Sequence, residues 1–572
     1  MIISKEFYDK CGASYQKVID ELEKKIAEIE KYDDATKGKK LILTIYHFSK
    51  RHLLPGEYWE HCLCRNMKLY NPDKLRRKII KHAYYHLYLN KKWSSRFYWG
   101  SNYPKLDFFR SHFQWQQLNT IYERDLYYPH DQLKLCLRKF GQETTKPPSK
   151  NLYKRCEEMM ALYPKIQAAI GDIDEWFQLL LKVNDDKYLK DNVEYRIGHN
   201  LHDVKLWKLY INHLKQNGHF KYLLGIYSKY CRFFLDDDDM KKEYQKAMLE
   251  YGPVHLPWKN LFEFEKGCDM EEIEHQYFIP DEKEDDAQSS EDLFDKSICR
   301  RFYVTYKAFQ EFALPGPIIL YVLENAGHQV LRKLFASCKW FFKKQPTPIC
   351  YGLRTGPREI YEGESLTLKE YSKKQSFAKN FYITGNMFCK MLDHAVLIDF
   401  LPKFYRCEAK FICLPSVNLS FNELKSLIGH GGVVELDIYC CKLEDEKNED
   451  VALEKILAFL PNIEILYLPN VKMTKETPHA LTSMKFNSKF EGINIDLISG
   501  VPFDAEEFLK FLIINKINEP YQFFNCEFTF RKEFNADFVQ MFKKLMKDYS
   551  TPDEYCTVDV HVDGWWDVGE ED

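Results

Sequence analysis

The chain has 572 residues, which at about 100–200 residues per domain predicts two to four domains. Its 82 Lys and Arg residues are balanced by 85 Asp and Glu residues, and a formal charge of −3 argues against a general nucleic-acid coat. Hydrophobic residues make up 45% of the chain, which excludes wholesale disorder. The aromatic content of 16% is typical of stacked helices, and scarce Gly and Pro disfavour a large all-β protein.

The sequence shows no targeting or metal-binding pattern. The first residues, MIISKEFYDKCGASY, contain no apolar run of signal-peptide length, and no segment approaches the roughly 20 apolar residues that cross a bilayer. The 17 cysteines are odd in number and scattered, which indicates reduced thiols in a cytosolic or nuclear protein. The pairs Cys62 with Cys64 and Cys440 with Cys441 lack a second ligand pair at zinc spacing, so packing is favoured over metal binding. We therefore expect no metal and no cofactor.

The clearest helical pattern begins at Leu206. A first stripe at i, i+3, i+4 and i+7 consists of Trp207, Tyr210, Ile211 and Leu214. Asn217-Gly218 ends that helix, and a second stripe at the same spacing consists of Phe220, Leu223, Leu224 and Tyr227. Since neither helix can bury its stripe alone, the pattern predicts an αα-hairpin of the length of one helical repeat.

Partial copies of this pattern occur elsewhere in the first half. Trp258 to Glu265 repeats the first-helix pattern as W-x-x-L-x-x-F-E, and Leu118 to Arg124, LNTIYER, repeats the second-helix pattern before Pro129. A generic helical bundle is the alternative, but the recurrence favours a solenoid. In that solenoid Trp207, Tyr210, Tyr227 and Trp258 are structural repeat residues.

Two segments carry a resemblance to a known family. LNTIYERDLYYPHDQL and LWKLYINHLKQNGHFKYLLGIYSKYC resemble the half-a-TPR repeats of the pre-mRNA-processing factor 39 family, over roughly residues 50–270. Ser228-Lys229 stands where the family has Glu-Arg. The resemblance implies a non-enzymatic scaffold in pre-mRNA splicing that works with the U1 small nuclear ribonucleoprotein in 5′ splice-site recognition. It also implies a nuclear location, with the cytosol as the alternative, and protein partners through which any RNA contact is indirect.

An acidic segment divides the chain. Residues 281–295, DEKEDDAQSSEDLFD, have almost no apolar content and cannot bury enough surface to offset their ordering entropy. We therefore predict a helical repeat domain at 1–280 and an acidic linker at 281–297. A weaker break, ETTKPPSK, lies at 143–150, where two prolines end any helix.

Downstream, apolar residues recur at the spacing L-x-x-L-x-L-x-x-N/C-x-L. The first of the two fullest copies consists of Val433, Leu436, Ile438, Cys441 and Leu443. The second consists of Ile463, Leu466, Leu468, Val471 and Met473. Further copies begin at Ala378, Ala409 and Phe490. The spacing resembles leucine-rich repeats and predicts an α/β leucine-rich-repeat-like region at 351–572. An ordinary α/β domain with a parallel sheet is the alternative. For the whole chain we predict a mostly α fold: a helical solenoid, a short helical segment and this α/β region.

The short helical segment lies at 298–350. Its sequence FALPGPIILYVLENAGHQVLRKLFASCKWFF resembles a divergent F-box, the module that docks on Skp1-type adaptors of ubiquitin ligases. The resemblance implies that Leu314 and Pro315 dock the adaptor, and it gives an alternative function, a substrate adaptor of a Skp1–cullin ubiquitin ligase. A plain buried pair of helices is the other interpretation.

No motif in the sequence indicates catalysis. The chain has no G-x-x-x-x-G-K-S/T loop, no H-E-x-x-H helix and no G-x-G-x-x-G after a strand, so we predict a protein that is not an enzyme. The basic segment KLRRKIIK, at 74–81, could neutralise phosphates, but its apolar stripe favours a solvated helix face.

The predicted strands also define a candidate partner face. Residues between the buried positions point to the opposite face of a sheet, and they include Glu435, Asp437, Tyr439 and Tyr467. Acidic and aromatic side chains favour a protein partner with a basic rim over nucleic acid, because carboxylates repel phosphate. The alternative is that these residues only keep the sheet soluble.

Overall fold

The computed structural model describes residues 1–31, 37–62, 79, 81–88, 121–130, 132–254, 256, 258–265, 301, 312–356, 360–369, 380–389, 401–415, 418–439, 442–518, 524–550 and 556–563. The chain divides into two compact units. The first comprises Met1–Ser111, Tyr127–Leu133 and Cys156–Asp292, and the second comprises His112–Leu126, Lys134–Arg155 and Leu293–Asp572. The predicted linker at 281–297 lies outside the described residues, as does most of the basic segment at 74–81, so both remain predictions.

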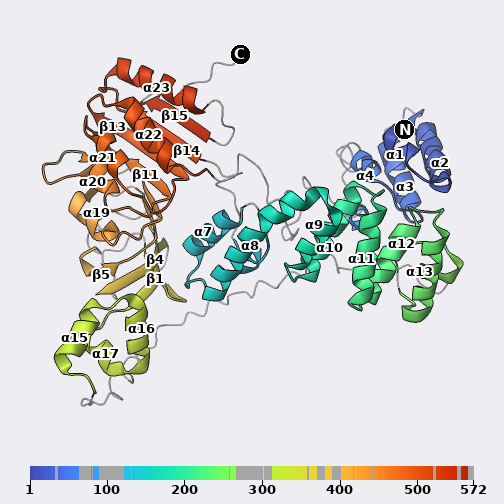
Figure 1. Cartoon of the computed structure of the whole chain (residues 1–572), viewed down its shortest axis with the longest axis horizontal. Helices are drawn as coiled ribbons and strands as arrows, with labels where there is room; N and C mark the ends of the chain where they lie inside the picture. The colour runs from blue at the N-terminus through green and yellow to red at the C-terminus, as the bar shows by residue number, and fades with distance from the viewer. Residues whose placement is uncertain are drawn as a thin grey trace. The chain divides into compact units, whose positions relative to one another are not determined.

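The first unit is helical (Figure 1). In chain order its helices are α1 (Lys5–Asp9), α2 (Ala13–Glu30), α3 (Lys37–Ser49), α4 (Gly56–Glu60), α8 (Lys150–Ala168), α9 (Ile173–Leu181), α10 (Asp186–His199), α11 (Val204–Gln216), α12 (Phe220–Cys231) and α13 (Asp238–Tyr251). The unit includes α8 from Cys156 onward. Each helix from α9 to α12 packs against the next one along the chain.

Local sequence sets the ends of these helices. The carboxylates of Asp172, Asp185, Asp203 and Asp237 accept hydrogen bonds from N–H groups in the first turns of α9, α10, α11 and α13. Each such N-cap stabilises its helix by about 1 kcal/mol. Gly218 follows α11 with a φ of 71°, a conformation that side chains other than glycine rarely adopt.

The αα-hairpin predicted from Leu206 is confirmed. α11 and α12 pack against each other and bury both predicted stripes apart from Phe220. Large aromatic rings also fill the interior of the unit elsewhere, which accounts for the aromatic content of its sequence; the largest fully buried ones belong to Trp59, Trp176, Trp207, Trp258, Tyr15, Tyr58, Tyr188, Tyr210, Tyr227, Tyr230 and Tyr244.

Two further helix predictions are wrong. In the described part of LNTIYER, Ile121 and Tyr122 are irregular, and Glu123–Leu126 is a 3₁₀-helix. Residues from Trp258 to Glu265 are likewise irregular until the 3₁₀-helix Glu263–Glu265. Both segments have a helical spacing over less than three turns, and short helices gain too few hydrogen bonds to offset the cost of nucleation.

The second unit contains a 13-stranded sheet within its described residues. Its strands are β1 (Ile349–Gly356), β2 (Ile360–Glu362), β3 (Ser365–Lys369), β4 (Phe381–Phe388), β5 (Phe404–Cys407), β6 (Phe411–Pro415), β8 (Glu435–Tyr439), β10 (Val451–Ala452), β11 (Ile465–Pro469), β12 (Val471–Met473), β13 (Gly492–Gly500), β14 (Phe524–Phe530) and β15 (Cys556–Val562). From β4 through β6, β8, β11, β13 and β14 to β15, neighbouring strands follow in chain order and pair in parallel. A separate pair, β7 (Leu419–Ser420) with β9 (Leu443–Glu444), is also parallel.

Helices of this unit connect the strands or lie at its margins. They are α7 (Leu133–Glu143), α15 (Gly316–Asn325), α16 (His328–Ser337), α17 (Lys339–Lys344), α19 (Phe421–Ile428), α20 (Leu453–Leu457), α21 (Thr477–Ser483), α22 (Ala505–Asn515) and α23 (Ala536–Ser550). The predicted F-box-like segment contains α15, α16 and α17. The weak break at 143–150 separates α7 from α8.

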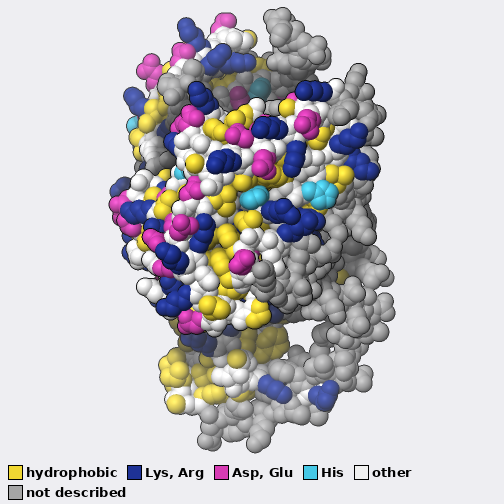
Figure 2. Space-filling view, turned by 90° about the vertical axis from the view of Figure 1, so that its right-hand side faces the viewer, with side chains coloured by type: hydrophobic (Ala, Val, Ile, Leu, Met, Phe, Trp, Pro, Cys, Tyr) yellow, Lys and Arg dark blue, Asp and Glu magenta, His cyan; other side chains and the backbone are white. Residues whose placement is uncertain are grey.

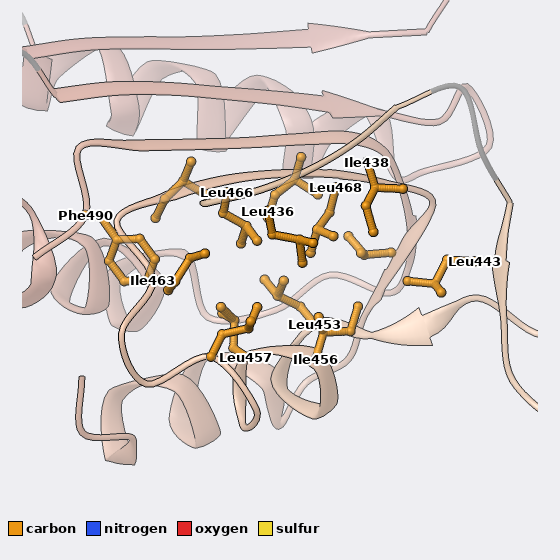
Figure 3. Packing of buried hydrophobic residues seen from close by; sticks show 14 of the residues in the cluster. Leu436, Ile438, Leu443, Leu453, Ile456, Leu457, Ile463, Leu466, Leu468 and Phe490 are labelled. Carbon is orange, nitrogen blue, oxygen red and sulfur yellow. The ribbon is translucent and has the colours of Figure 1, made fainter. Parts of the chain in front are cut away.

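The core of the second unit lies between the strands and helices α19 to α23. Leu436 of β8 pairs in register with Leu466 of β11, and Leu466 pairs with Ile493 of β13. Figure 3 shows Leu436 and Leu466 facing Leu453 and Leu457 of α20. All five are fully buried, and burial of each such side chain is worth about 1.5–3 kcal/mol.

The prediction of a mostly α fold is wrong. An α/β unit with a large, mainly parallel sheet replaces the leucine-rich-repeat-like region, beside a helical first unit. The sequence pattern located strands only between Ala378 and Ile498, whereas β1 to β3, β14 and β15 lie outside that range. In β14 the buried residues Phe524, Cys526 and Phe528 alternate with less buried ones, which is the period of a strand and not of a helix.

Candidate binding site on the sheet

One face of the sheet carries polar side chains in register. Glu435 and Asp437 of β8 alternate with buried aliphatic residues, so they point away from the core. Strand pairing places Asp437 beside Tyr467 of β11, Tyr467 beside Asn494 of β13, and Asn494 beside Glu527 of β14. This outer face therefore presents carboxylates on two of its strands.

Ion pairs join helix α7 to the outer face, and Figure 1 draws this helix beside β1 and β4. Arg138 pairs with both Glu464 and Glu491, the residues that precede β11 and β13, and its Nη1 lies 2.7 Å from Glu491 Oε2. Lys134 Nζ lies 2.8 Å from Glu491 Oε1 and 4.0 Å from Glu464 Oε2. Two basic side chains thus share two neighbouring carboxylates.

The spacing of the contacts indicates that α7 crosses the strands. Lys134, Arg138 and Gln142 stand four residues apart, so they share one face of the helix. Four residues advance a helix by about 6 Å, and neighbouring strands lie about 4.8 Å apart, so each turn meets another strand. Accordingly Gln142 Nε2 donates a hydrogen bond of 2.6 Å to Glu435 Oε2 on the next strand, β8.

Gly141 brings the last turn of α7 close to β1 and β4. The Tyr351 hydroxyl and Asn386 Nδ2 each donate a hydrogen bond of 3.0 Å to the Gly141 carbonyl oxygen. A Cβ atom at this position would lie 3.3 Å from the Phe411 ring. A glycine therefore suits this position, because the helix backbone itself contacts the sheet.

Arg354 of β1 binds the carboxyl end of α7. Its Nη2 donates to the carbonyl oxygens of Gln142 and Thr144 at 3.1 and 2.9 Å. The last carbonyl groups of a helix lack partners within the helix and carry partial negative charge. The guanidinium satisfies two acceptors and complements that charge.

The glutamates of this site differ in their affinity for protons. Burial raises the pKa of Glu435 to about 7, against the opposing effect of the Arg138 charge. Burial would also raise the pKa of Glu491, but hydrogen bonds and charges from Arg138 and Lys134 lower it overall. The site therefore holds Glu491 as a carboxylate and leaves Glu435 close to titration near neutral pH.

The predicted partner face lies at this site. Glu435, Asp437 and Tyr467 are half-buried, and Tyr439 lies in β8 with its side chain outside the described ones. Burial, with the nearby carboxylates of Asp437 and Glu435, raises the pKa of Tyr467 to about 12. The binding role of these residues remains a prediction. Glu435 and Asp437 do not stand in open solvent, because α7 and the neighbouring strands enclose part of them.

The predicted structural residues lie inside the helical unit. Trp207, Tyr210 and Tyr227 are each at most 1% exposed. The Trp207 indole donates to the Leu201 carbonyl oxygen at 3.0 Å, and the Tyr227 hydroxyl donates to Glu243 at 2.8 Å. The apolar bodies of all three are buried, and the polar atoms of Trp207 and Tyr227 are satisfied, as expected of supports.

Trp258 belongs to a buried polar cluster of the helical unit. Its indole donates to the Tyr85 hydroxyl at 3.1 Å, and the Arg232 guanidinium lies 5.0 Å from its ring centre. Arg232 also binds both carboxylate oxygens of Glu265, at 2.7 and 2.8 Å. Burial opposes the charge of Glu265, but Arg232 lowers its pKa overall.

The predicted adaptor-docking residues lie at the start of α15 and are exposed. Leu314 is 55% exposed, and Pro315 is the N-cap residue of α15. Ile318 and Tyr321, four and seven residues after Leu314, are 47% and 67% exposed. These spacings place the three side chains on one side of the segment, while Ile319 and Leu323 are buried.

Sequence reasoning missed the residues of α7. Lys134, Arg138 and Gln142 form a polar stripe at i, i+4 and i+8, and this period could have identified a helix face with a polar partner. The glutamates that receive it, Glu464 and Glu491, each stand directly before a strand. What the sequence could not give is the pairing of a segment near residue 138 with strands more than 300 residues later.

The described residues offer no site for a metal. They contain no group of three or more His, Cys, Asp or Glu side chains that could hold an ion. The described cysteines are free thiols, and all of them except Cys338 are buried. Cys62 is one of these buried thiols.

Comparisons with known proteins give no family. No family model matches the chain. A search of curated proteins finds no match either. Among the described helices, none has both the length and the apolar character that a membrane crossing requires.

Proposed function

We propose that the chain is a non-enzymatic nuclear scaffold that acts in pre-mRNA splicing with the U1 small nuclear ribonucleoprotein. The observation that carries this proposal is the hairpin of α11 and α12, since residues 206–231 hold the clearest resemblance to the pre-mRNA-processing factor 39 family. Its aromatic residues are interior supports. Partners would therefore meet the outer surfaces of the scaffold.

The surface charge favours protein partners. On the face drawn in Figure 2, Lys and Arg side chains are interspersed with Asp and Glu side chains. Strong phosphate binding needs clustered positive charge, because each neutralised phosphate releases counterions. A mixed surface suits proteins, and we propose that any RNA contact is made through them.

Affinity purification of the tagged full chain from nuclear extract, with mass spectrometry, tests the proposal. We expect U1 proteins in the eluate, and we expect ribonuclease treatment beforehand to leave their recovery unchanged. Loss of U1 proteins after ribonuclease would contradict the indirect RNA contact. Their absence from untreated eluates would contradict the splicing role.

The second candidate function is a substrate adaptor of a Skp1–cullin ubiquitin ligase. The exposed apolar side of α15, with Leu314, Ile318 and Tyr321, favours it, because such surfaces mark protein contacts. Recovery of a Skp1-type protein that Leu314→Asp abolishes would support this candidate. Val501→Asp is the matched control, since Val501 is 44% exposed and lies after β13 in the same unit.

A further inference from the structure

We propose that the outer face of the sheet is a receptor for a basic helix of another protein, and that α7 is an internal ligand that such a helix displaces. This inference builds on the proposal that the chain is a binding scaffold, and it names the class of partner. The recognised pattern is a helix with Lys or Arg at i and i+4 and an amide at i+8, as in Lys134, Arg138 and Gln142.

The sheet does not need α7 for its core. The hydrophobic cluster between the strands and helices α19 to α23 contains no residue of α7 among its described members. The contacts of α7 with the outer face are ion pairs and hydrogen bonds, together with the close approach of Gly141 to the Phe411 ring. Removal of α7 therefore leaves this hydrophobic cluster in place, and it exposes the Phe411 ring together with carboxylates that water can solvate.

The path of the chain also sets α7 apart. Residues 134–155 belong to the second unit, whereas the segments directly before and after them, 127–133 and 156–292, belong to the first. Pro147 and Pro148 lie in the connection between α7 and α8. The helix thus lies between two connecting segments of the chain, and it can detach from the sheet as one element.

The site selects its ligand by charge and by close approach. Glu464 and Glu491 hold one guanidinium between them, which favours Arg at the central position because its fork can contact two carboxylates. Three positions later, at Gly141, a Cβ atom would lie 3.3 Å from the Phe411 ring, which favours a small residue there. Phosphate groups are excluded by the carboxylates, and the partner is therefore a protein helix.

A binding experiment on the full chain tests the proposal. The probe is a fluorescein-labelled peptide with the sequence of residues 132–146, and binding is measured by fluorescence anisotropy. The variant K134E/R138E releases α7 by repulsion from Glu464 and Glu491. We expect this variant to bind the peptide at least about tenfold more tightly than the wild-type chain, because a tethered helix competes at an effective concentration in the millimolar range.

Matched controls separate the site from general charge effects. Lys150→Glu changes an exposed charge at the start of α8, and we expect it to bind the peptide no better than the wild-type chain does. A peptide with both basic residues replaced by glutamate should not bind. Equal binding by all chains, or no binding by a K134E/R138E variant that keeps its circular-dichroism spectrum, overturns the proposal.

A second measurement does not depend on folding of the variant. Excess unlabelled peptide added to the wild-type chain should speed hydrogen exchange in α7 and leave β8, β11 and β13 unchanged. No change in α7 at millimolar peptide contradicts displacement. If light scattering shows that the wild-type chain forms a dimer and the K134E/R138E variant does not, the face binds a second copy of the chain. This result would overturn the proposal of a helix from another protein. Each outcome is independent of whether U1 proteins are recovered.

Discussion

The two units place their charged groups in different surroundings. In the helical unit, Arg232 and Glu265 form an ion pair in which each side chain is 1% exposed. In the sheet unit the core is apolar, and on the outer face Arg138, itself 6% exposed, meets Glu464 and Glu491, which stay 20% and 17% exposed. A fully enclosed charge depends on its partner, whereas a carboxylate at a rim can exchange its partner for water or for another cation. The first arrangement supports a fold and the second suits a binding site.

The largest expected effect lies in the aromatic core of the helical unit. Replacing Trp207 with Ala removes a fully buried ring and leaves a cavity, so the free energy of unfolding should fall by about 3–5 kcal/mol. Urea unfolding followed by circular dichroism measures it. Leu249→Ala, at a site that is 79% exposed on α13, should change it by less than about 0.5 kcal/mol. A small effect at Trp207 would contradict its role as a support.

Replacing Arg232 with Met tests the enclosed ion pair. The change leaves the Glu265 carboxylate buried without its cation, and we expect a loss of about 3 kcal/mol in the free energy of unfolding. The same urea experiment measures the loss. A variant as stable as the wild-type chain would remove the contrast between the two units.

Arg138→Met is the matching change on the sheet. Because Glu464 and Glu491 can be solvated once α7 loosens, we expect only about 1 kcal/mol of destabilisation. Hydrogen exchange should show the effect in α7 and not in the strands. A loss as large as that of Arg232→Met would mean that both ion pairs support the fold in the same way.

The last expected effect is a pH dependence at Glu435. Its folded pKa of about 7 lies above the ordinary value of 4.5, so its stabilising contribution is complete below pH 4.5 and is lost as the pH rises through about 7. Glu435→Gln keeps this position neutral, so the variant should gain stability relative to the wild-type chain as the pH rises from about 4.5 to about 8. Urea titrations at several pH values measure this difference. A constant difference between the two chains would place the Glu435 pKa near its ordinary value.

Local patterns predicted local structure in both units. The hairpin of α11 and α12 could be predicted because each apolar stripe continues over about two turns and Gly218 separates the two helices. Strands β4, β6, β8, β11 and β13 could be located from spacings of 24 to 31 residues between apolar templates. The short segments near Ile121 and Trp258 could not, because their conformation depends on tertiary contacts.

Of the candidate site, only the residues on the sheet could be predicted from the sequence, and not those on α7. Alternation along β8 placed Glu435 and Asp437 on the outer face, and their acidity indicated a basic partner. The segment that supplies basic side chains to this face, α7, lies more than 290 residues earlier, and its own amphipathic pattern does not specify what it packs against. Long-range pairing of this kind is a property of the folded chain and not of either segment.

Hydrogen exchange of the wild-type full chain tests the central claim most directly. If α7 is a displaceable ligand of the sheet, it opens locally, and its amides should exchange roughly tenfold or more faster than those of β8, β11 and β13. Higher ionic strength should widen that gap, since Lys134 and Arg138 form ion pairs with partly exposed carboxylates. Equal protection of α7 and these three strands, unchanged by salt, would show that the helix is a fixed part of the fold and would contradict the account.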